Sequence, residues 1–312
     1  MSGVATREGK NLVNFILIGV CMIAGMLFRV SKLLPADAYK GINAWIIYLA
    51  LPAVSFKYLP HIHWSSQLLF PVLMPLIVWL GGWLFVKVYS SANKINKSTE
   101  GCLKLSSGLS NTSFVGFPLI MAYFSDKQLG IAVICDQVTF MVLSTAGVLV
   151  AINASQKQEL SAIAIIKKVL RFPPFLGCVG ALTIPHFIDI SSLDPFFDKL
   201  ALTVAPLALF SIGLQLKFDG WKNELKHIGA SMAYKLLIAP ALVLGVALLM
   251  GLKGVIPQVA IFEAAMPTLL TSGVVSEEYN VNPKLSSLII GISILVAFAT
   301  TALWYHILQI LQ

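Results

Sequence analysis

Long apolar runs, separated by short polar intervals, recur along the whole 312-residue chain. A run of about 20 mainly apolar residues can cross a bilayer as an α-helix. The pattern predicts an all-α polytopic membrane protein with about ten transmembrane helices, of which the fourth and ninth are polar and interrupted by proline. The expected spans are Asn11–Val30, Ile42–Tyr58, Leu69–Tyr89, Cys102–Phe124, Gly130–Ile152, Pro174–Ile188, Phe196–Leu216, Ile228–Met250, Val255–Ser276 and Leu285–Leu308.

The two interrupting prolines, Pro118 and Pro267, lie at corresponding places in the two halves of the chain. A helix broken at membrane depth frees backbone groups that hydrocarbon cannot satisfy, so such a break persists only inside packed protein or beside a cavity. Paired breaks in two halves point to the substrate site of a secondary transporter. The alternative is that both prolines are packing kinks.

A second pair of motifs supports an internal repeat. Pro52-x-x-x-Phe56 in the second span matches Pro206-x-x-x-Phe210 in the seventh, although this match alone could arise by chance. Five spans in each half is an odd number, so the second copy must be inserted upside down. We therefore expect two inverted five-helix repeats, residues 1–152 and 172–312, joined by a cytoplasmic linker at residues 153–171.

The composition agrees with this class of protein. Of all residues, 57% are hydrophobic and 12% are charged, whereas a soluble domain carries roughly 25% charged residues. The four cysteines fall inside apolar segments, which favours packing over a disulfide framework. The sequence has no metal-ligand spacing, phosphate-binding glycine loop or nucleophile–base arrangement, so we predict no enzyme activity, no cofactor and no metal site.

The basic residues predict the orientation. When alternate loops are assigned to alternate sides, 15 of the 22 Lys and Arg residues fall on one side and 6 on the other. The positive-inside rule makes the richer side cytoplasmic. We therefore expect a multi-pass protein of the cell membrane with both termini non-cytoplasmic. The net charge of +8 reflects this topology, and its spread over short loops argues against nucleic-acid binding.

The segments Gly108-Leu109-Ser110-Asn111-Thr112 to Gly116-Phe117-Pro118-Leu119, Ala264-Ala265-Met266-Pro267 and Glu278 to Pro283 resemble the auxin efflux carrier family. That family includes plant PIN carriers and bacterial organic-acid transporters. The resemblance covers essentially the whole chain in span number and repeat order. It implies an inverted-repeat fold with a scaffold domain and a transport domain, crossed broken helices, and an elevator-like movement that carries anionic substrates. The chain lacks the long central loop of the plant carriers.

The breaks themselves predict an anion site. Each half-helix that follows a break begins with unpaired N–H groups and the positive end of a dipole, which can bind a carboxylate without an arginine. We place the first break at Gly116-Phe117-Pro118 and the second at Pro267. Asn111 and Thr268 could add side-chain hydrogen bonds. The predicted substrate-binding residues are Asn111, Thr112, Gly116, Pro118, Met266, Pro267 and Thr268.

Ionisable groups within spans are costly and suggest function. Asp136, with Gln137 beside it, lies in the fifth span, Lys235 in the eighth and Glu263 one turn before Pro267. Because burial disfavours a charged carboxyl group, Asp136 or Glu263 could carry a proton and couple transport to a proton gradient. Either could instead be a structural partner of Lys235 or a backbone cap, and Lys235 could extend towards the membrane interface. A sodium site is the weaker alternative.

Together these features predict a secondary transporter that moves a small organic anion, a carboxylate, by an elevator-type mechanism in the lipid bilayer, with protons as a further partner. The alternative is an anion channel or a uniporter that uses the same broken-helix site. The sequence leaves open the substrate, the coupling ion, the direction of transport, and whether the protein forms a homodimer.

Overall fold

The computed structural model describes residues 2–62, 65–155, 163, 167, 170–216 and 219–311, with side chains from residue 13 onward. Most of the predicted linker at residues 153–171 therefore lies outside the described residues. Within them, seven helical segments are long and apolar enough to cross a membrane. They are Val13–Val30, Ala38–His61, Ser66–Asn93, Asp126–Ala154, Ser191–Gln215, Trp221–Leu249 and Pro283–Ile310.

Three of the ten expected spans consist of shorter helices. The fourth contains α5 (Lys97–Gly108), the π-helical turn η4 (Thr112–Gly116) and α6 (Phe117–Tyr123). The sixth corresponds to α10 (Pro173–Thr183), and the ninth to α15 (Val255–Ala264) and α16 (Leu270–Glu278). The multi-pass helical class agrees with the sequence prediction, and the ten-span count and the inverted repeat stay predictions.

The chain forms two compact units, and each unit draws on both halves of the sequence. Unit 1 comprises Met1–Trp64, Ser113–Val133 and Leu170–Leu216, and unit 2 comprises Ser65–Thr112, Ile134–Val169 and Lys217–Gln312. The helix α7 (Leu129–Val142) begins in unit 1 and ends in unit 2. The boundaries of the compact units therefore differ from those of the expected sequence repeats.

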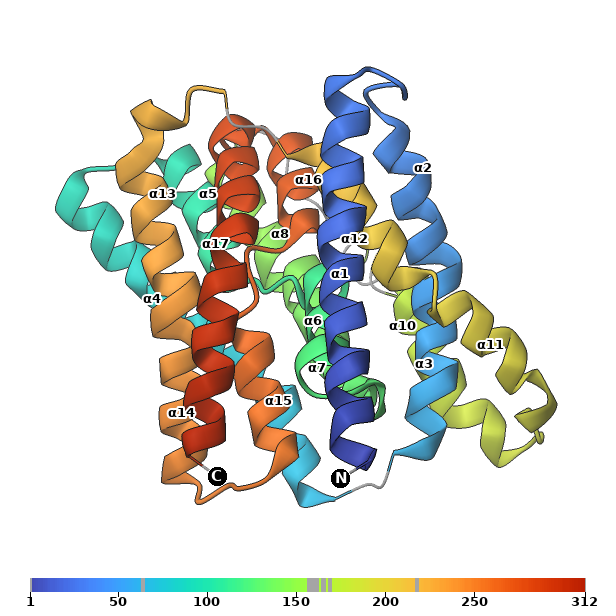
Figure 1. Cartoon of the computed structure of the whole chain (residues 1–312). Helices are drawn as coiled ribbons and strands as arrows, with labels where there is room; N and C mark the ends of the chain where they lie inside the picture. The colour runs from blue at the N-terminus through green and yellow to red at the C-terminus, as the bar shows by residue number, and fades with distance from the viewer. Residues whose placement is uncertain are drawn as a thin grey trace. The chain divides into compact units, whose positions relative to one another are not determined.

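In unit 1, the long helix α1 (Ser2–Val30) packs against α12 (Val204–Gln215) and α6 (Figure 1). The helices and helical turns of unit 1 are α1, α2 (Ala38–Trp45), η1 (Ile46–Ala50), α3 (Leu51–Tyr58), η2 (Leu59–His61), α6, η5 (Asp126–Gln128), α10, η7 (Ile184–His186), η8 (Ser191–Leu193), α11 (Asp194–Ala201) and α12.

Close glycine contact joins α1 to α12. A Cβ atom added at Gly25 would lie 2.2 Å from the Phe210 carbonyl oxygen, and one added at Gly213 would lie 2.3 Å from the Met22 carbonyl oxygen. Small residues let two helix backbones approach in this way. Near this crossing, the ring of Phe28 meets that of Phe210 edge to face, with centroids 5.4 Å apart.

The repeated Pro-x-x-x-Phe motifs both serve packing in unit 1. Pro52 lies against Gly177 of α10, where an added Cβ would be 2.6 Å from the proline Cα. The Phe56 ring stacks on Phe197 of α11 at 4.9 Å. Because Phe210 of the second motif packs against α1, the two copies contact different helices of the same unit.

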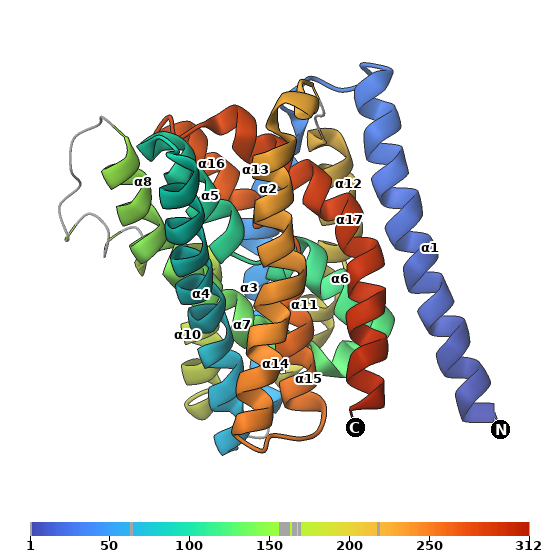
Figure 2. The same cartoon turned by 90° about the vertical axis from the view of Figure 1, so that its left-hand side faces the viewer.

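Unit 2 contains the other described helices and helical turns, apart from η4, which crosses the boundary between the units. They are η3 (Ser66–Leu68), α4 (Leu69–Asn93), α5, the C-terminal part of α7, η6 (Leu143–Gly147), α8 (Val148–Ala154), η9 (Trp221–Glu224), α13 (Leu225–Met232), η10 (Ala233–Ile238), α14 (Ala239–Leu249), α15, α16 and α17 (Pro283–Ile310). Figures 1 and 2 show α13 and α14 as one long segment beside α17.

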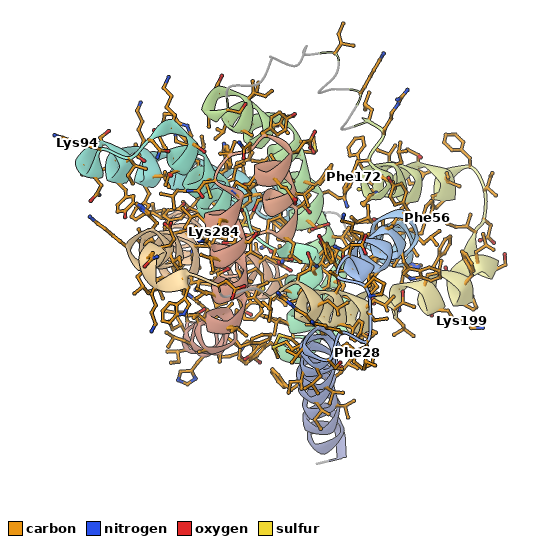
Figure 3. The ribbon with its side chains drawn as sticks, turned by 90° about the horizontal axis from the view of Figure 1, so that it is seen from above. Phe28, Phe56, Lys94, Phe172, Lys199 and Lys284 are labelled. Atoms are coloured by element: carbon orange, nitrogen blue, oxygen red, sulfur yellow. The ribbon has the colours of Figure 1, made fainter. Side chains whose placement is uncertain are left out.

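Local chemistry sets the ends of these helices. The side chain of Asn96 accepts a 2.8 Å hydrogen bond from the Thr99 N–H and so caps α5, and Asn282 caps α17 directly before Pro283. Lys94 ends α4 in the left-handed conformation, with φ of 50°. Its exposed side chain lies at the edge of unit 2 in Figure 3, on the side that the charge pattern predicts to be cytoplasmic.

Buried apolar side chains of α4, α5, α8 and α17 contribute to a hydrophobic core cluster of unit 2. Two buried hydrogen bonds also join helices of unit 2: the Tyr234 hydroxyl donates to the Val78 carbonyl at 2.7 Å, and the Trp304 indole N–H donates to the Leu236 carbonyl at 2.8 Å. Buried aromatic N–H and O–H groups need such partners. These bonds hold η10, the turn that carries Lys235, between α4 and α17.

Candidate functional site

The first helix break lies upstream of the predicted position. Helix α5 ends at Gly108, Leu109 is extended, and helical structure resumes at Thr112. The expectation of a break at Gly116-Phe117-Pro118 is therefore wrong, because these residues lie in continuous helical structure. Pro118 occupies the first turn of α6. This position tolerates proline, because the first N–H groups of an α-helix have no partner within that α-helix. Gly108 lets the end of α5 approach α4 closely, since an added Cβ would lie 2.7 Å from the Trp79 ring.

The second break contains Pro267, as predicted. Helix α15 ends at Ala264, and α16 begins at Leu270 after the extended residue Leu269. Met266 is fully buried in this break, and its N–H donates to the Glu263 carbonyl.

The two breaks pair with each other inside unit 2. The Asn111 N–H donates to the Pro267 carbonyl at 2.8 Å, and the Leu269 N–H donates to the Leu109 carbonyl at 3.1 Å. Ser110 and Thr268 face each other in this short antiparallel bridge. We call this pairing of the two breaks the crossing. Each extended segment satisfies backbone N–H and C=O groups of the other, which a helix break inside a membrane would otherwise leave unpaired.

Side chains of Thr268 and Ser293 secure the crossing. The Thr268 hydroxyl donates to the Ser106 carbonyl in the last turn of α5 at 2.8 Å, and its N–H donates to the Ser293 hydroxyl of α17 at 3.3 Å. The hydroxyl predicted to bind substrate thus ties the second break to α5. We interpret Thr268 as a positioning residue.

The side chains of Asn111 and Ser110, unlike those of Thr268 and Ser293, make no hydrogen bond within the described residues. Both residues are buried, and the atoms without a partner there are the amide nitrogen and oxygen of Asn111 and the Ser110 hydroxyl. Sequence reasoning selected Asn111 and missed Ser110, although its place beside Asn111 in the polar break was a signal. Buried polar groups are nearly always satisfied, so these two are candidates to bind a ligand.

Asp136 is tied to the start of η4. Its carboxyl oxygen accepts a 2.6 Å hydrogen bond from the Thr112 hydroxyl. A carboxylate beside the first residue of a helical segment interacts favourably with the local dipole. Gln137, the next residue of α7, is buried, and its side-chain oxygen has no hydrogen-bond partner in the described ranges.

Lys235 and Glu263 flank the second break. The Lys235 ammonium donates to the Ala264 carbonyl at the end of α15 at 2.7 Å. Lys235 is fully buried, so the alternative that it extends to the membrane interface is wrong. Glu263 is also fully buried, and neither carboxyl oxygen has a hydrogen-bond partner within the part of the chain that the structure describes. It is close enough to Asp136 and Lys235 to interact electrostatically with both.

Unit 2 therefore brings together most of the predicted site residues: Asn111, Thr112, Asp136, Gln137, Lys235, Glu263, Met266, Pro267 and Thr268. Gly116 and Pro118 belong to unit 1, and their role stays a prediction. Among the described residues, no group of three or more His, Cys, Asp and Glu side chains could hold a metal ion.

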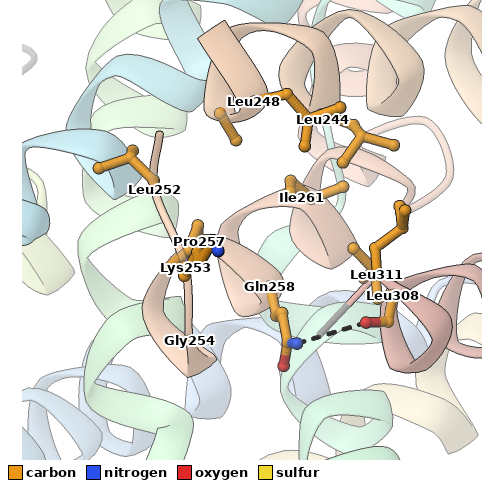
Figure 4. Close-up of a pocket in the computed structure, with 11 residues that line it drawn as sticks. Leu244, Leu248, Leu252, Lys253, Gly254, Pro257, Gln258, Ile261, Leu308 and Leu311 are labelled. Carbon is orange, nitrogen blue, oxygen red and sulfur yellow. Dashed lines mark hydrogen bonds between the residues drawn. The ribbon is translucent and has the colours of Figure 1, made fainter. Parts of the chain in front are cut away.

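A pocket in unit 2 lies apart from these residues, between the ends of α14, α15 and α17 (Figure 4). Its volume is about 50 Å³, and none of the predicted site residues line it. The Gln258 side-chain amide donates to the Leu308 carbonyl across it at 3.3 Å. The lining is mainly aliphatic, with Leu244, Leu248, Leu252, Ile261, Leu308 and Leu311, and its charged residue, Lys253, is exposed, so we do not assign a carboxylate to it.

Comparison with known proteins identifies the family. A family model described as membrane transport protein matches residues 12–305, nearly the whole chain. The chain belongs to this family. It is 24% identical over 303 residues to an uncharacterized transporter of Methanocaldococcus jannaschii, covering 94% of this chain and 97% of that protein.

Two further relatives have names that state a transport activity. A protein of Rhizobium meliloti, named as a candidate malonate transporter, is 26% identical over 290 residues, with 88% of each chain covered. Auxin efflux carrier component 2 of Oryza sativa is 32% identical over 109 residues, which are 33% of this chain and 17% of that protein. The resemblance to auxin efflux carriers is thereby confirmed, and this membrane transport protein is not an enzyme.

Proposed function

We propose that this membrane transport protein is a secondary transporter that carries a small carboxylate by alternating access and couples its movement to protons. The crossing of the two breaks carries the proposal. It bonds Asn111, whose buried side-chain amide is unsatisfied within the described residues, to the break between α15 and α16, and the buried carboxyl group of Glu263 lies in the last turn of α15. The name of the Rhizobium meliloti relative makes malonate a first probe.

The start of α16 is the proposed binding point for the carboxylate. Its N-cap residue, Leu269, has no polar side chain that could satisfy the first N–H groups, and these groups favour an anion. The side-chain amide of Asn111 would donate a second hydrogen bond to the carboxylate. The backbone N–H of the same residue is bonded to the Pro267 carbonyl. Asp136 already occupies the start of η4, so we do not place the substrate there.

Glu263 is the proposed proton carrier. A buried carboxylate without partners is costly, and protonation removes that cost. With Asp136 and Lys235 charged and Glu263 protonated, the three groups together are neutral, whereas loss of the proton leaves a net negative charge that repels a carboxylate. Substrate and proton would then move in the same direction. The buried Lys235 ammonium would repel sodium from the same place.

We further propose an elevator-type movement, in which unit 2 carries the substrate and unit 1 is the scaffold. The division of the chain into two compact units, each assembled from both halves, supports this proposal. The resemblance to auxin efflux carriers implies the same arrangement.

Uptake of labelled malonate into proteoliposomes, measured with an acidic exterior, tests the proposal. We expect saturable uptake that a proton gradient accelerates, and counterflow when the vesicles are preloaded with malonate. Asn111→Ala should weaken malonate binding about tenfold, because a hydrogen bond to a charged group is lost. Flux that does not saturate would favour an anion channel, and saturable flux without pH dependence would favour a uniporter.

A further inference from the structure

The polar atoms that remain unpaired at the crossing limit the chemistry of the substrate. The hydroxyls of Thr112 and Thr268 are committed to Asp136 and the Ser106 carbonyl, and backbone groups of the crossing bond to each other. In the described part of unit 2, the amide of Asn111 and the hydroxyl of Ser110 are left without partners at the crossing.

An unpaired side-chain amide needs two kinds of hydrogen-bond partner, an acceptor and a donor. Its nitrogen donates and its oxygen accepts, and both atoms of Asn111 are unpaired with respect to the described residues. The requirement is therefore the same whichever way round the amide lies. The Ser110 hydroxyl can donate or accept, so it can adapt to either partner.

A simple carboxylate meets only half of this requirement. All its oxygens accept, so it can pair with the amide nitrogen, the Ser110 hydroxyl and the first N–H groups of α16. The amide oxygen of Asn111 would stay buried beside another acceptor, which is unfavourable. A ligand with a hydrogen-bond donor next to its carboxylate satisfies both amide atoms.

We propose that the preferred substrate is a 2-hydroxycarboxylate, whose carboxylate accepts from the Asn111 amide nitrogen and whose hydroxyl donates to the amide oxygen. This proposal rests on the proposed function and names the substrate class of the same site. A 2-ammonium group could also donate, but the Lys235 ammonium is held on Ala264, three residues before Pro267, and would repel a second cation.

Matched pairs of ligands test this proposal. Binding of propionate and lactate, succinate and malate, and malonate and hydroxymalonate is measured by titration calorimetry on the purified full-length protein in lipid nanodiscs. The pH is held where all the acids are ionised. We expect each hydroxylated ligand to bind about tenfold more tightly than its partner, since one hydrogen bond completes a buried pair. Alanine and aspartate serve as ammonium-bearing probes.

Variants separate recognition from packing. In Asn111→Ala, the affinity ratio within each pair should fall towards one. The matched control is Ser286→Ala, which removes a buried hydroxyl of α17, and it should keep the wild-type ratio. Equal affinities within the pairs in the wild type, or tighter binding of the amino acids, would overturn the hydroxycarboxylate proposal. Failure of every carboxylate to bind would overturn the proposed function itself.

Discussion

Buried polar residues of unit 2 fall into two groups. The side chains of Thr268 and Lys235 donate hydrogen bonds to carbonyls at the ends of α5 and α15, so they hold the crossing in place. Asn111 and Glu263 have unpaired side-chain atoms within the described ranges and are the stronger candidates for binding and coupling. Sequence reasoning selected all four, because polar residues in apolar spans are rare. It could not separate the groups, since pairing depends on which segments meet in space.

Glu263→Gln should preserve carboxylate binding and abolish the pH dependence of uptake into proteoliposomes. Glutamine has nearly the shape of the protonated acid, so the variant mimics the neutral state at every pH. In the wild type, uptake should rise as the outside is acidified, because protonation of Glu263 removes the charge that repels the substrate. The measurement is initial uptake of labelled malonate across a range of external pH.

Glu277→Gln is the control for this variant, because Glu277 is an exposed residue of α16 and its change should leave the pH profile as it is. Asp136→Asn tests the other buried carboxyl group. If Glu263→Gln and Asp136→Asn both keep the wild-type profile, proton coupling through these residues is wrong.

At the scale of elements, the sequence located one break correctly and misplaced the other. Pro267 lies in the interval between α15 and α16, whereas Pro118 lies in the first turn of α6, after the π-helical turn η4. Proline is compatible with both positions. What ends α5 is the extended conformation of Leu109, which pairs with Leu269. A long-range pairing of this kind leaves no local signal in the sequence.

This difference predicts that the two prolines are not equivalent. Pro267→Ala restores an N–H group inside the second break and lets helix extend towards Leu270, so it should displace the Pro267 carbonyl from Asn111 and lower malonate transport several-fold. Pro118→Ala leaves the first break in place and should have a smaller effect. Both variants are compared in proteoliposomes at equal protein content, and equal activity of Pro267→Ala and wild type would show that the proline is only a packing kink.

Glycine contact between α1 and α12 gives a second prediction at this scale. Gly25→Ala places a methyl group where it would lie 2.2 Å from the Phe210 carbonyl oxygen, and overpacking of this kind costs roughly 1–3 kcal/mol. We expect a clearly lower midpoint of thermal unfolding in detergent. Gly19→Ala, in the same helix, has nothing within 4 Å of the added methyl and should unfold at or above the wild-type temperature. A Gly25→Ala variant as stable as Gly19→Ala would contradict the close packing.

At the scale of the whole molecule, the internal repeat and the compact units are different divisions of the chain. The Pro-x-x-x-Phe pair contributes to unit 1, through Pro52 and Phe210, and the crossing joins Asn111 to Pro267 in unit 2. Motifs that match between the halves thus belong to the same unit. The sequence shows the correspondence of the motifs, but periodicity carries no information on which spans pack together, so the units could not be predicted from it.

Orientation in the membrane is the remaining prediction at this scale. The charge pattern places Lys94 in the cytoplasm and Lys253 outside, and both side chains are exposed. In intact cells, a membrane-impermeant maleimide should therefore label Lys253→Cys and should label Lys94→Cys only after the membrane is opened. The native cysteines Cys102 and Cys135 are buried, whereas Cys21 and Cys178 are partly exposed, so the unmodified protein sets the background. Labelling of Lys94→Cys in intact cells would reverse the predicted orientation and place both termini in the cytoplasm, because the ten predicted spans would keep them on the same side.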